Sequence, residues 1–218
     1  IKLYARQHRL AELVASQLYE REKNSRMMVE MLSQIIEFRT GDSDCHTRNI
    51  SIFTGLMIDS LLQKTDRYSF SLMERELIVT ASALHDIGKI GIDECILNKP
   101  GKLTKEEFEI MKTHTVIGAE ILKDITFVPH IVEVARNHHE RYDGTGYPRG
   151  LAGEDIPYMA RILTIADCFD AMTARRPYKK PLSVSYAVSE LKKNSGTQFD
   201  PELVNVFIRL INEGKITV

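Results

Sequence analysis

The chain has 218 residues, of which 43% are hydrophobic and 27% charged, and its formal net charge is −1. A chain of this length can bury a core without disulfide bonds, and its near-neutral charge excludes the overall basic field that is typical of DNA-binding proteins. We therefore expect a globular protein that holds any anionic ligand through a local cluster of charges.

The first 39 residues contain neither glycine nor proline and are rich in residues that favour helices, which predicts one or two helices. A hydrophobic seam could run through Leu3, Leu10, Leu13, Met27 and Met31. Gln17, Glu20 and Asn24 interrupt this seam, so a sustained coiled coil is not predicted. We predict that residues 1–39 are a helical lead-in, which either packs on the body or transmits a signal from an upstream domain.

Helical patterns continue through the rest of the chain, and strand signals are almost absent. Helices are predicted at residues 45–63, 72–84, 105–121, 129–140, 157–174, 183–194 and 201–213. Thr104 and Glu107 have the spacing of a capping box, and Phe108 begins a helical stripe that ends at Ile121. The fold class is therefore all-α, with residues 40–218 as the main domain.

The stretch Leu84–Gly91 places an imidazole, a carboxylate and an ammonium group close together. His85 and Asp86 lie at the predicted end of a helix, and Lys89 follows three residues later. Adjacent side chains on a helix diverge by about 100°. His85 and Asp86 can therefore serve neighbouring metal ions, with the two oxygens of Asp86 able to bridge them.

Five of the seven histidines lie at predicted helix ends or beside acidic residues. They are His46, His85, His114, His138 and His139. Imidazole and carboxylate ligands without cysteine suit iron, manganese, nickel or zinc. Together with Asp86 and Asp167 these histidines are too many for one ion, which predicts a two-metal site able to clamp a phosphoryl group.

Several motifs occur in an order that resembles the HD-GYP family, a branch of the HD-domain metal-dependent phosphohydrolases. The motifs are His85-Asp86 with Gly88-Lys89, His114, His138-His139-Glu140, Asp143-Gly144-Thr145-Gly146-Tyr147-Pro148, and Asp167-x-x-Asp170 followed by Arg176-Pro177-Tyr178. The resemblance covers about residues 40–212 and implies an HD-domain helical bundle.

The resemblance also implies hydrolysis of cyclic di-GMP to linear pGpG and, in some members, to GMP. The implied metal ligands are His46, His85, Asp86, His114, His138, His139 and Asp167, with Asp86 as the bridge. Two divalent ions are expected, with iron or manganese first and nickel or zinc as alternatives. Family members with a third metal commonly have Glu four residues before the first histidine. This chain has Asp42 there, which leaves a third ion open.

Substrate contacts follow from the same resemblance. Lys89 is expected to face the attacking water or the scissile phosphate, Arg176 and Lys179 to bind phosphates, and Tyr147 to shape the mouth of the pocket. Asn49 stands where the family tends to have Arg. Two other functions stay open, namely hydrolysis of another cyclic dinucleotide such as cyclic GMP-AMP, and a weakly active module that senses a cyclic dinucleotide.

Roles for two further acidic residues also stay open. Asp170 could orient a metal ligand or stabilise its helix, and Glu140 could belong to the site or to an exposed helix terminus.

Location and partners are predicted from what the sequence contains. Three dispersed cysteines, Cys45, Cys95 and Cys168, form no paired motif and fit a reducing cytoplasm. No stretch approaches the roughly 18 apolar residues of a membrane span, so this segment is not expected to insert into a membrane. The chain begins with Ile1, which fits a segment of a longer protein with an upstream sensor or receiver domain, and tethering of that protein to a membrane stays open. No DNA partner is expected, and a homodimer stays open.

Overall fold

The computed structural model describes residues 2–41, 46–63, 72–124, 129–174 and 180–217. Within these ranges the chain is helical and contains no strand, only two isolated bridges. The prediction of an all-α fold is confirmed.

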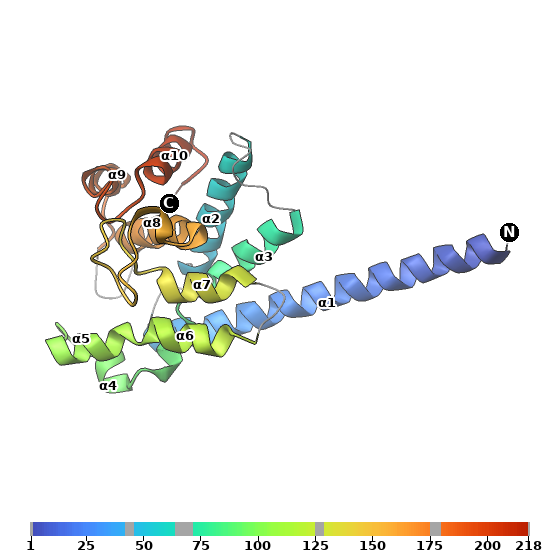
Figure 1. Ribbon diagram of the computed structural model, residues 1–218, viewed down its shortest axis with the longest axis horizontal. Helices are drawn as coiled ribbons and strands as arrows, with labels where there is room; N and C mark the ends of the chain where they lie inside the picture. The colour runs from blue at the N-terminus through green and yellow to red at the C-terminus, as the bar shows by residue number, and fades with distance from the viewer. Residues whose placement is uncertain (1, 42–45, 64–71, 125–128, 175–179, 218) are drawn as a thin grey trace.

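Helix α1 (Lys2–Thr40) is a single continuous helix of 39 residues. It projects from the body, and its N-terminal end lies far from the other helices (Figure 1). Near its C-terminal end Ser33, Ile36 and Glu37 are buried, so the last turns of the helix pack on the body. The division between a lead-in of residues 1–39 and a main domain stays a prediction.

The larger hydrophobic core lies between α2 (His46–Leu62), α8 (Tyr158–Thr173) and α10 (Pro201–Asn212), with α3 (Leu72–Ser82) and α9 (Val184–Lys193) against them. Phe53, Phe169 and Phe207 meet edge to face at its centre, with ring centroids 5.0 to 6.0 Å apart. Such aromatic contacts add to the stabilisation that comes from burial. The buried helix α8 is therefore a rigid support for Asp167 and Asp170.

A second core holds the short helix η1 (Ile87–Gly91) against α6 (His114–Leu122) and α7 (Pro129–Asn137). Two other short elements, α4 (Glu94–Leu97) and η2 (Gly153–Asp155), lie in the connecting segments. This second core carries the histidine motifs, whereas the first carries Asp167.

One predicted helix is divided in two, which corrects the prediction of a continuous stripe from Phe108 to Ile121. The chain forms α5 (Lys105–Lys112) and then α6, and both Phe108 and Ile121 are exposed. The predicted capping box of Thr104 and Glu107 is present at the start of α5. At the division the side chain of His114 donates to the carbonyl of Met111 at 2.7 Å, and the same carbonyl accepts the backbone N–H of Thr113.

Candidate metal centre

The structure brings all seven predicted metal ligands together in two adjoining clusters. One cluster contains Asp86, His114, His138 and His139, and the other contains His46, His85 and Asp167. Within each cluster the candidate ligand atoms lie within 4.8 Å of one another. Six of the seven candidate ligands lie at or beside a helix end, whereas Asp167 lies within α8.

Asp86 lies between the clusters and directs one carboxylate oxygen to each. Its Oδ1 is 3.3 Å from His114 Nε2 and 3.7 Å from His138 Nε2. Its Oδ2 is 3.3 Å from His85 Nε2 and accepts a hydrogen bond of 2.7 Å from Lys89 Nζ. This arrangement is the one expected of a bridging carboxylate.

Three of the histidines are oriented by backbone carbonyls near the ends of helices. Nδ1 of His85 lies 2.8 Å from Ser82 O, Nδ1 of His114 lies 2.7 Å from Met111 O, and Nδ1 of His138 lies 2.9 Å from Ala135 O. The last carbonyls of a helix lack intrahelical partners, so each can accept a proton from a ring. With the proton held at Nδ1, the lone pair of Nε2 faces the cluster.

Two buried polar atoms of the centre show that a cation fits there. Among the described residues, His85 Nε2 and Asp86 Oδ1 have no hydrogen-bond partner. Unpartnered polar atoms are costly to bury, and a cation would satisfy both. The two His/Asp clusters therefore fit a centre of two metal ions.

Electrostatics keep most of these groups in the state that a ligand requires. Burial alone would raise the pKa of Asp86, but the charge of Lys89 holds it well below its usual range. Burial lowers the pKa of His114 to about 4 and that of His139 well below its ordinary value. Asp86 is therefore ionised and both histidines are neutral at neutral pH, as metal binding needs.

Asp170 contacts the candidate ligand His46, which favours the first of its two predicted roles, that of orienting a ligand. Its side chain is fully buried, and its Oδ2 lies 2.6 Å from His46 Nδ1. The other oxygen accepts a hydrogen bond of 2.7 Å from Asn49. Asn49, which departs from the family pattern, thus takes part in the same network. The sequence did indicate that Asp170 lies near the centre, because Asp167 and Asp170 are three residues apart and share one helix face.

The Asp170→Asn variant should bind metal less tightly by about 10- to 100-fold in the cluster of His46. An asparagine has one carbonyl oxygen, and its amide would face the donor of either His46 or Asn49. Metal content after dialysis against a chelator measures the effect, with Asp155→Asn, an exposed carboxylate on η2, as the control. Equal metal retention in Asp170→Asn and wild type would contradict the role in orienting His46.

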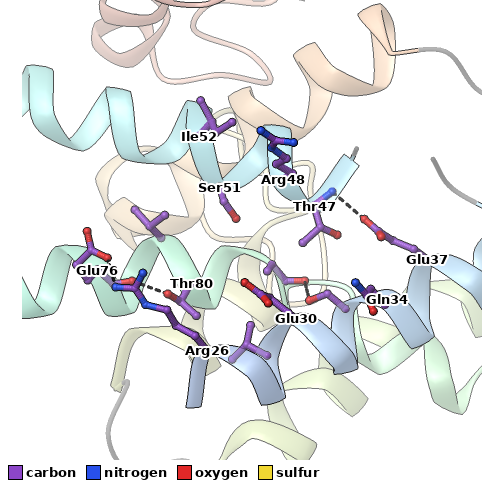
Figure 2. A pocket seen from close by; sticks show the side chains of 14 residues that line it. Arg26, Glu30, Gln34, Glu37, Thr47, Arg48, Ser51, Ile52, Glu76 and Thr80 are labelled. Carbon is purple, nitrogen blue, oxygen red and sulfur yellow. Dashed lines mark hydrogen bonds and ion pairs between the residues drawn. The ribbon is translucent and has the colours of Figure 1, made fainter. Parts of the chain in front are cut away.

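The last turns of α1 hold backbone segments next to the candidate ligands. Glu37 accepts a hydrogen bond of 2.9 Å from the backbone N–H of Thr47, which directly follows His46 (Figure 2). Such N–H groups in the first turn of a helix have no intrahelical acceptor. Arg39 donates to the backbone carbonyl of Ile92 at 2.6 Å and also to that of Ile90.

A groove of about 450 Å³ lies beside these contacts, between α1, α2 and α3 (Figure 2). Sequence patterns gave no sign that the lead-in helix reaches the centre, because the contacts are made largely to backbone atoms.

Tyr147 forms a wall beside the cluster of His139. Its ring stacks on that of His139, with centroids 4.8 Å apart, and Phe108 meets it edge to face at 6.1 Å. The ammonium group of Lys112 lies 5.7 Å from the centre of the same ring. Phe108 and Lys112 are four residues apart on α5; the sequence placed Phe108 only on a helical stripe and gave no sign of Lys112.

Glu140 holds the loop that contains Tyr147, so the alternative of an exposed helix terminus was wrong. Its side chain is buried, and its carboxylate accepts backbone N–H bonds from Arg149 at 2.7 Å and from Leu151 at 3.0 Å. Gly146 allows the close return of this loop, because a Cβ there would lie 2.3 Å from the backbone nitrogen of Arg141.

The Glu140→Gln variant is expected to raise KM for a bound substrate by roughly tenfold, since one backbone N–H would face an amide instead of a carboxylate. The turnover number should change less, because the carboxylate of Glu140 binds the backbone of the loop and not the side chain of a candidate ligand. Steady-state kinetics measures this, and Glu120→Gln, an exposed acid on α6, is the control. A normal KM in Glu140→Gln would show that the loop does not shape substrate binding.

The remaining predicted site residues divide into one that is near the centre and three that the structure does not describe. Lys89 lies beside Asp86 and is partly buried, so its ammonium group belongs to the centre. Asp42, Arg176 and Lys179 lie outside the described residues. A third ion at Asp42 and phosphate binding by Arg176 and Lys179 stay predictions.

Comparisons with known proteins agree with this geometry. A family profile described as an HD domain matches residues 30–203. A cyclic di-GMP phosphodiesterase of Thermotoga maritima is 41% identical over 192 residues, which are 85% of this chain and 49% of that protein. The 3′3′-cGAMP-specific phosphodiesterase 2 of Vibrio cholerae is 36% identical over 188 residues, which are 85% of this chain and 35% of that protein.

A solved structure has the same fold. The crystal structure of a cyclic GMP-AMP-specific phosphodiesterase of Vibrio cholerae superposes with a TM-score of 0.66 at 20% identity, covering 88% of this chain and 49% of that one. The chain spans about half, or less, of the length of these relatives.

Proposed function

Since the chain belongs to the HD-domain family and resembles its HD-GYP branch, we propose that it hydrolyses cyclic di-GMP to the linear dinucleotide pGpG. The observation that carries the proposal is the position of Asp86, which directs one oxygen to each of two His/Asp clusters. Phosphodiester hydrolysis requires stabilisation of both the attacking and the leaving oxygen, and a two-metal centre offers it.

The residues that would hold two ions are those of the two clusters, with Asp86 shared between them. When bound, two divalent ions supply Lewis-acid polarisation of the phosphoryl group and lower the pKa of water. Iron or manganese is our first expectation, and nickel or zinc is compatible with the same donor set.

The chain's own residues bind and orient the substrate in this proposal. Lys89 keeps a proton on Nζ next to Asp86 and adds positive charge where the phosphate must lie. Tyr147 excludes water on the side of His139. Arg176 offers two parallel donors to a second phosphate, and Lys179 adds a point charge. The attack of water on phosphorus breaks the bond to the 3′ oxygen, which leaves with a proton.

A related cyclic dinucleotide is the second candidate substrate. The relatives include 3′3′-cGAMP-specific phosphodiesterases at 36% and 33% identity, values close to those of cyclic di-GMP phosphodiesterases. No base-reading residue can be assigned from the described residues, so the two substrates are compared by experiment. A weakly active sensor of such a dinucleotide is the third alternative, prompted by Asp42 and Asn49.

Substrate and product are tested together. Protein purified without oxygen and loaded with iron or manganese is incubated with cyclic di-GMP and, separately, with 3′3′-cGAMP, and the products are separated by chromatography. The proposal is supported if linear pGpG, with or without GMP, forms from cyclic di-GMP faster than 3′3′-cGAMP is hydrolysed. If the protein hydrolysed 3′3′-cGAMP faster than cyclic di-GMP, 3′3′-cGAMP would be its substrate instead. Tight binding measured by calorimetry without turnover of either would support the sensor alternative.

The proposal also includes the neighbouring domains of the chain and its location in the cell. An upstream sensor or receiver domain agrees with the greater length of the relatives, and a cytoplasmic location agrees with the dispersed cysteines. In the described part of the chain, no helix is both long enough and apolar enough to span a membrane.

A further inference from the structure

The side of α1 that faces away from the body carries a regular apolar seam. Met28, Met31, Ile35 and Phe38 follow one another at intervals of three, four and three residues, which are the a and d positions of a heptad. Each of these side chains is at least half exposed, and that of Phe38 is 92% exposed. Four consecutive seam positions are therefore apolar and exposed.

The body occupies the opposite side of the same two turns. Ser33, Ile36 and Glu37, which are buried against the body, fall at positions f, b and c of this heptad. A helix that packed on the seam would displace none of these contacts. The projecting part of α1 points away from the body (Figure 1), so the body does not cover the seam there either.

We propose that α1 pairs in parallel and in register with α1 of a second copy of this chain. The positions that flank the seam support this particular partner. In a parallel pair, position g of one helix packs near position e of the next heptad of the other. Here Met27 meets Leu32, and Leu13 meets Leu18, so each of these four exposed flanking residues has an apolar partner in a copy of the same helix.

The polar middle of the helix fits a short seam better than a continuous coiled coil. Gln17, Arg21 and Asn24 take the seam positions between Val14 and Met28. Polar seam residues cost stability and fix the register, because a shifted pair would place them against apolar side chains. In register, Arg21 lies near Glu20 of the second copy, which is a pairing of opposite charges.

A second helix also explains how the projecting part of α1 is stabilised. Every described side chain from Leu13 to Arg21 is exposed, so the apolar side chains of these turns are not buried in a single copy. Most of the stability of a helix in a protein comes from packing of its apolar face. The pair would supply this packing to Leu13, Val14 and Leu18.

In the proposed dimer, the paired helices lie next to the metal centre. The turns that carry Ile35 and Phe38 on one side carry Glu37 and Arg39 toward the body, where they bind the backbone near His46 and Lys89. A change in the pairing of the two helices is therefore transmitted through one rigid element to the backbone of the centre.

Sedimentation velocity over a range of protein concentrations tests the interface. The wild-type chain is expected to be a dimer, and Ile35→Glu and Met31→Glu should each raise its dissociation constant about 30-fold or more. The control is Ile121→Glu, which changes a similarly exposed isoleucine on α6 and should leave the dimer intact. Circular dichroism confirms that each variant is folded. A wild-type monomer at high micromolar concentration, or a dimer unaffected by Ile35→Glu, would overturn the proposal.

Disulfide cross-linking tests the orientation of the two helices. In a chain whose native cysteines are replaced by serine, Phe38→Cys at a seam position should cross-link to its copy under mild oxidation. Glu30→Cys, at the exposed position c, is the matched control and should not. An antiparallel pair would separate the two copies of residue 38, so a dimer without this cross-link would overturn the parallel arrangement.

Discussion

The Asp86→Asn variant is expected to lose at least about 10³-fold in kcat/KM for cyclic di-GMP, a loss comparable with the removal of a major group that stabilises charge in the transition state. Asp86 is the residue whose two oxygens face both clusters, and Lys89 pairs with one of them. An amide at this position removes the negative charge and replaces one ligand oxygen by a nitrogen that cannot bind a cation.

Metal content separates this effect from a change in substrate binding alone. Elemental analysis should find fewer than the wild-type number of ions per chain in Asp86→Asn, because the loss affects both clusters. The Asp155→Asn variant, with its exposed carboxylate on η2, should keep both the metal and the activity. If Asp86→Asn retained wild-type metal stoichiometry, Asp86 would not be the bridge, whatever its effect on the rate.

The histidine motifs predicted the position of the centre well, because they are local in sequence and lie at helix ends. His85 and Asp86 are adjacent in sequence, as are His138 and His139, so helical geometry predicts how the two side chains of each pair diverge. The structure places both pairs in the centre. Their orientation could not be predicted in this way. It depends on which carbonyl each helix leaves unpaired at its end, and at His114 on the break between α5 and α6.

Contacts between distant segments were the harder part to infer. Asn49 and Asp170 are 121 residues apart, and a propensity or a motif cannot report that their side chains meet. Glu140 was ambiguous for a related reason, since its partners are backbone N–H groups of a loop, which have no signature in the sequence. The long helix α1 was predicted as helical, but the hydrogen bonds that its last turns make with the body go to backbone atoms of other segments, which have no signature in the sequence.

A close approach of two backbones keeps the two clusters together. Gly88 in η1 lies against α6, and a Cβ at this position would be 1.8 Å from the carbonyl oxygen of His114 and 2.4 Å from the backbone nitrogen of Gly118. These are backbone atoms, so they cannot move aside as a flexible side chain would. Glycine thus allows the segment with Asp86 and Lys89 to reach the helix that begins with His114.

The Gly88→Ala variant should therefore lower the free energy of unfolding by about 3 to 5 kcal/mol, near the upper end of single substitutions. It should also lose metal, since η1 and α6 must separate to admit the methyl group. The control is Gly55→Ala inside α2, where a Cβ would meet only side chains, the nearest being that of Val79 at 3.4 Å. That change should be neutral or stabilise the protein by up to about 1 kcal/mol, because alanine favours a helix. Urea unfolding followed by circular dichroism, together with elemental analysis, distinguishes the two variants. Gly88→Ala with the stability and metal content of Gly55→Ala would show that the contact between η1 and α6 is not needed to form the centre.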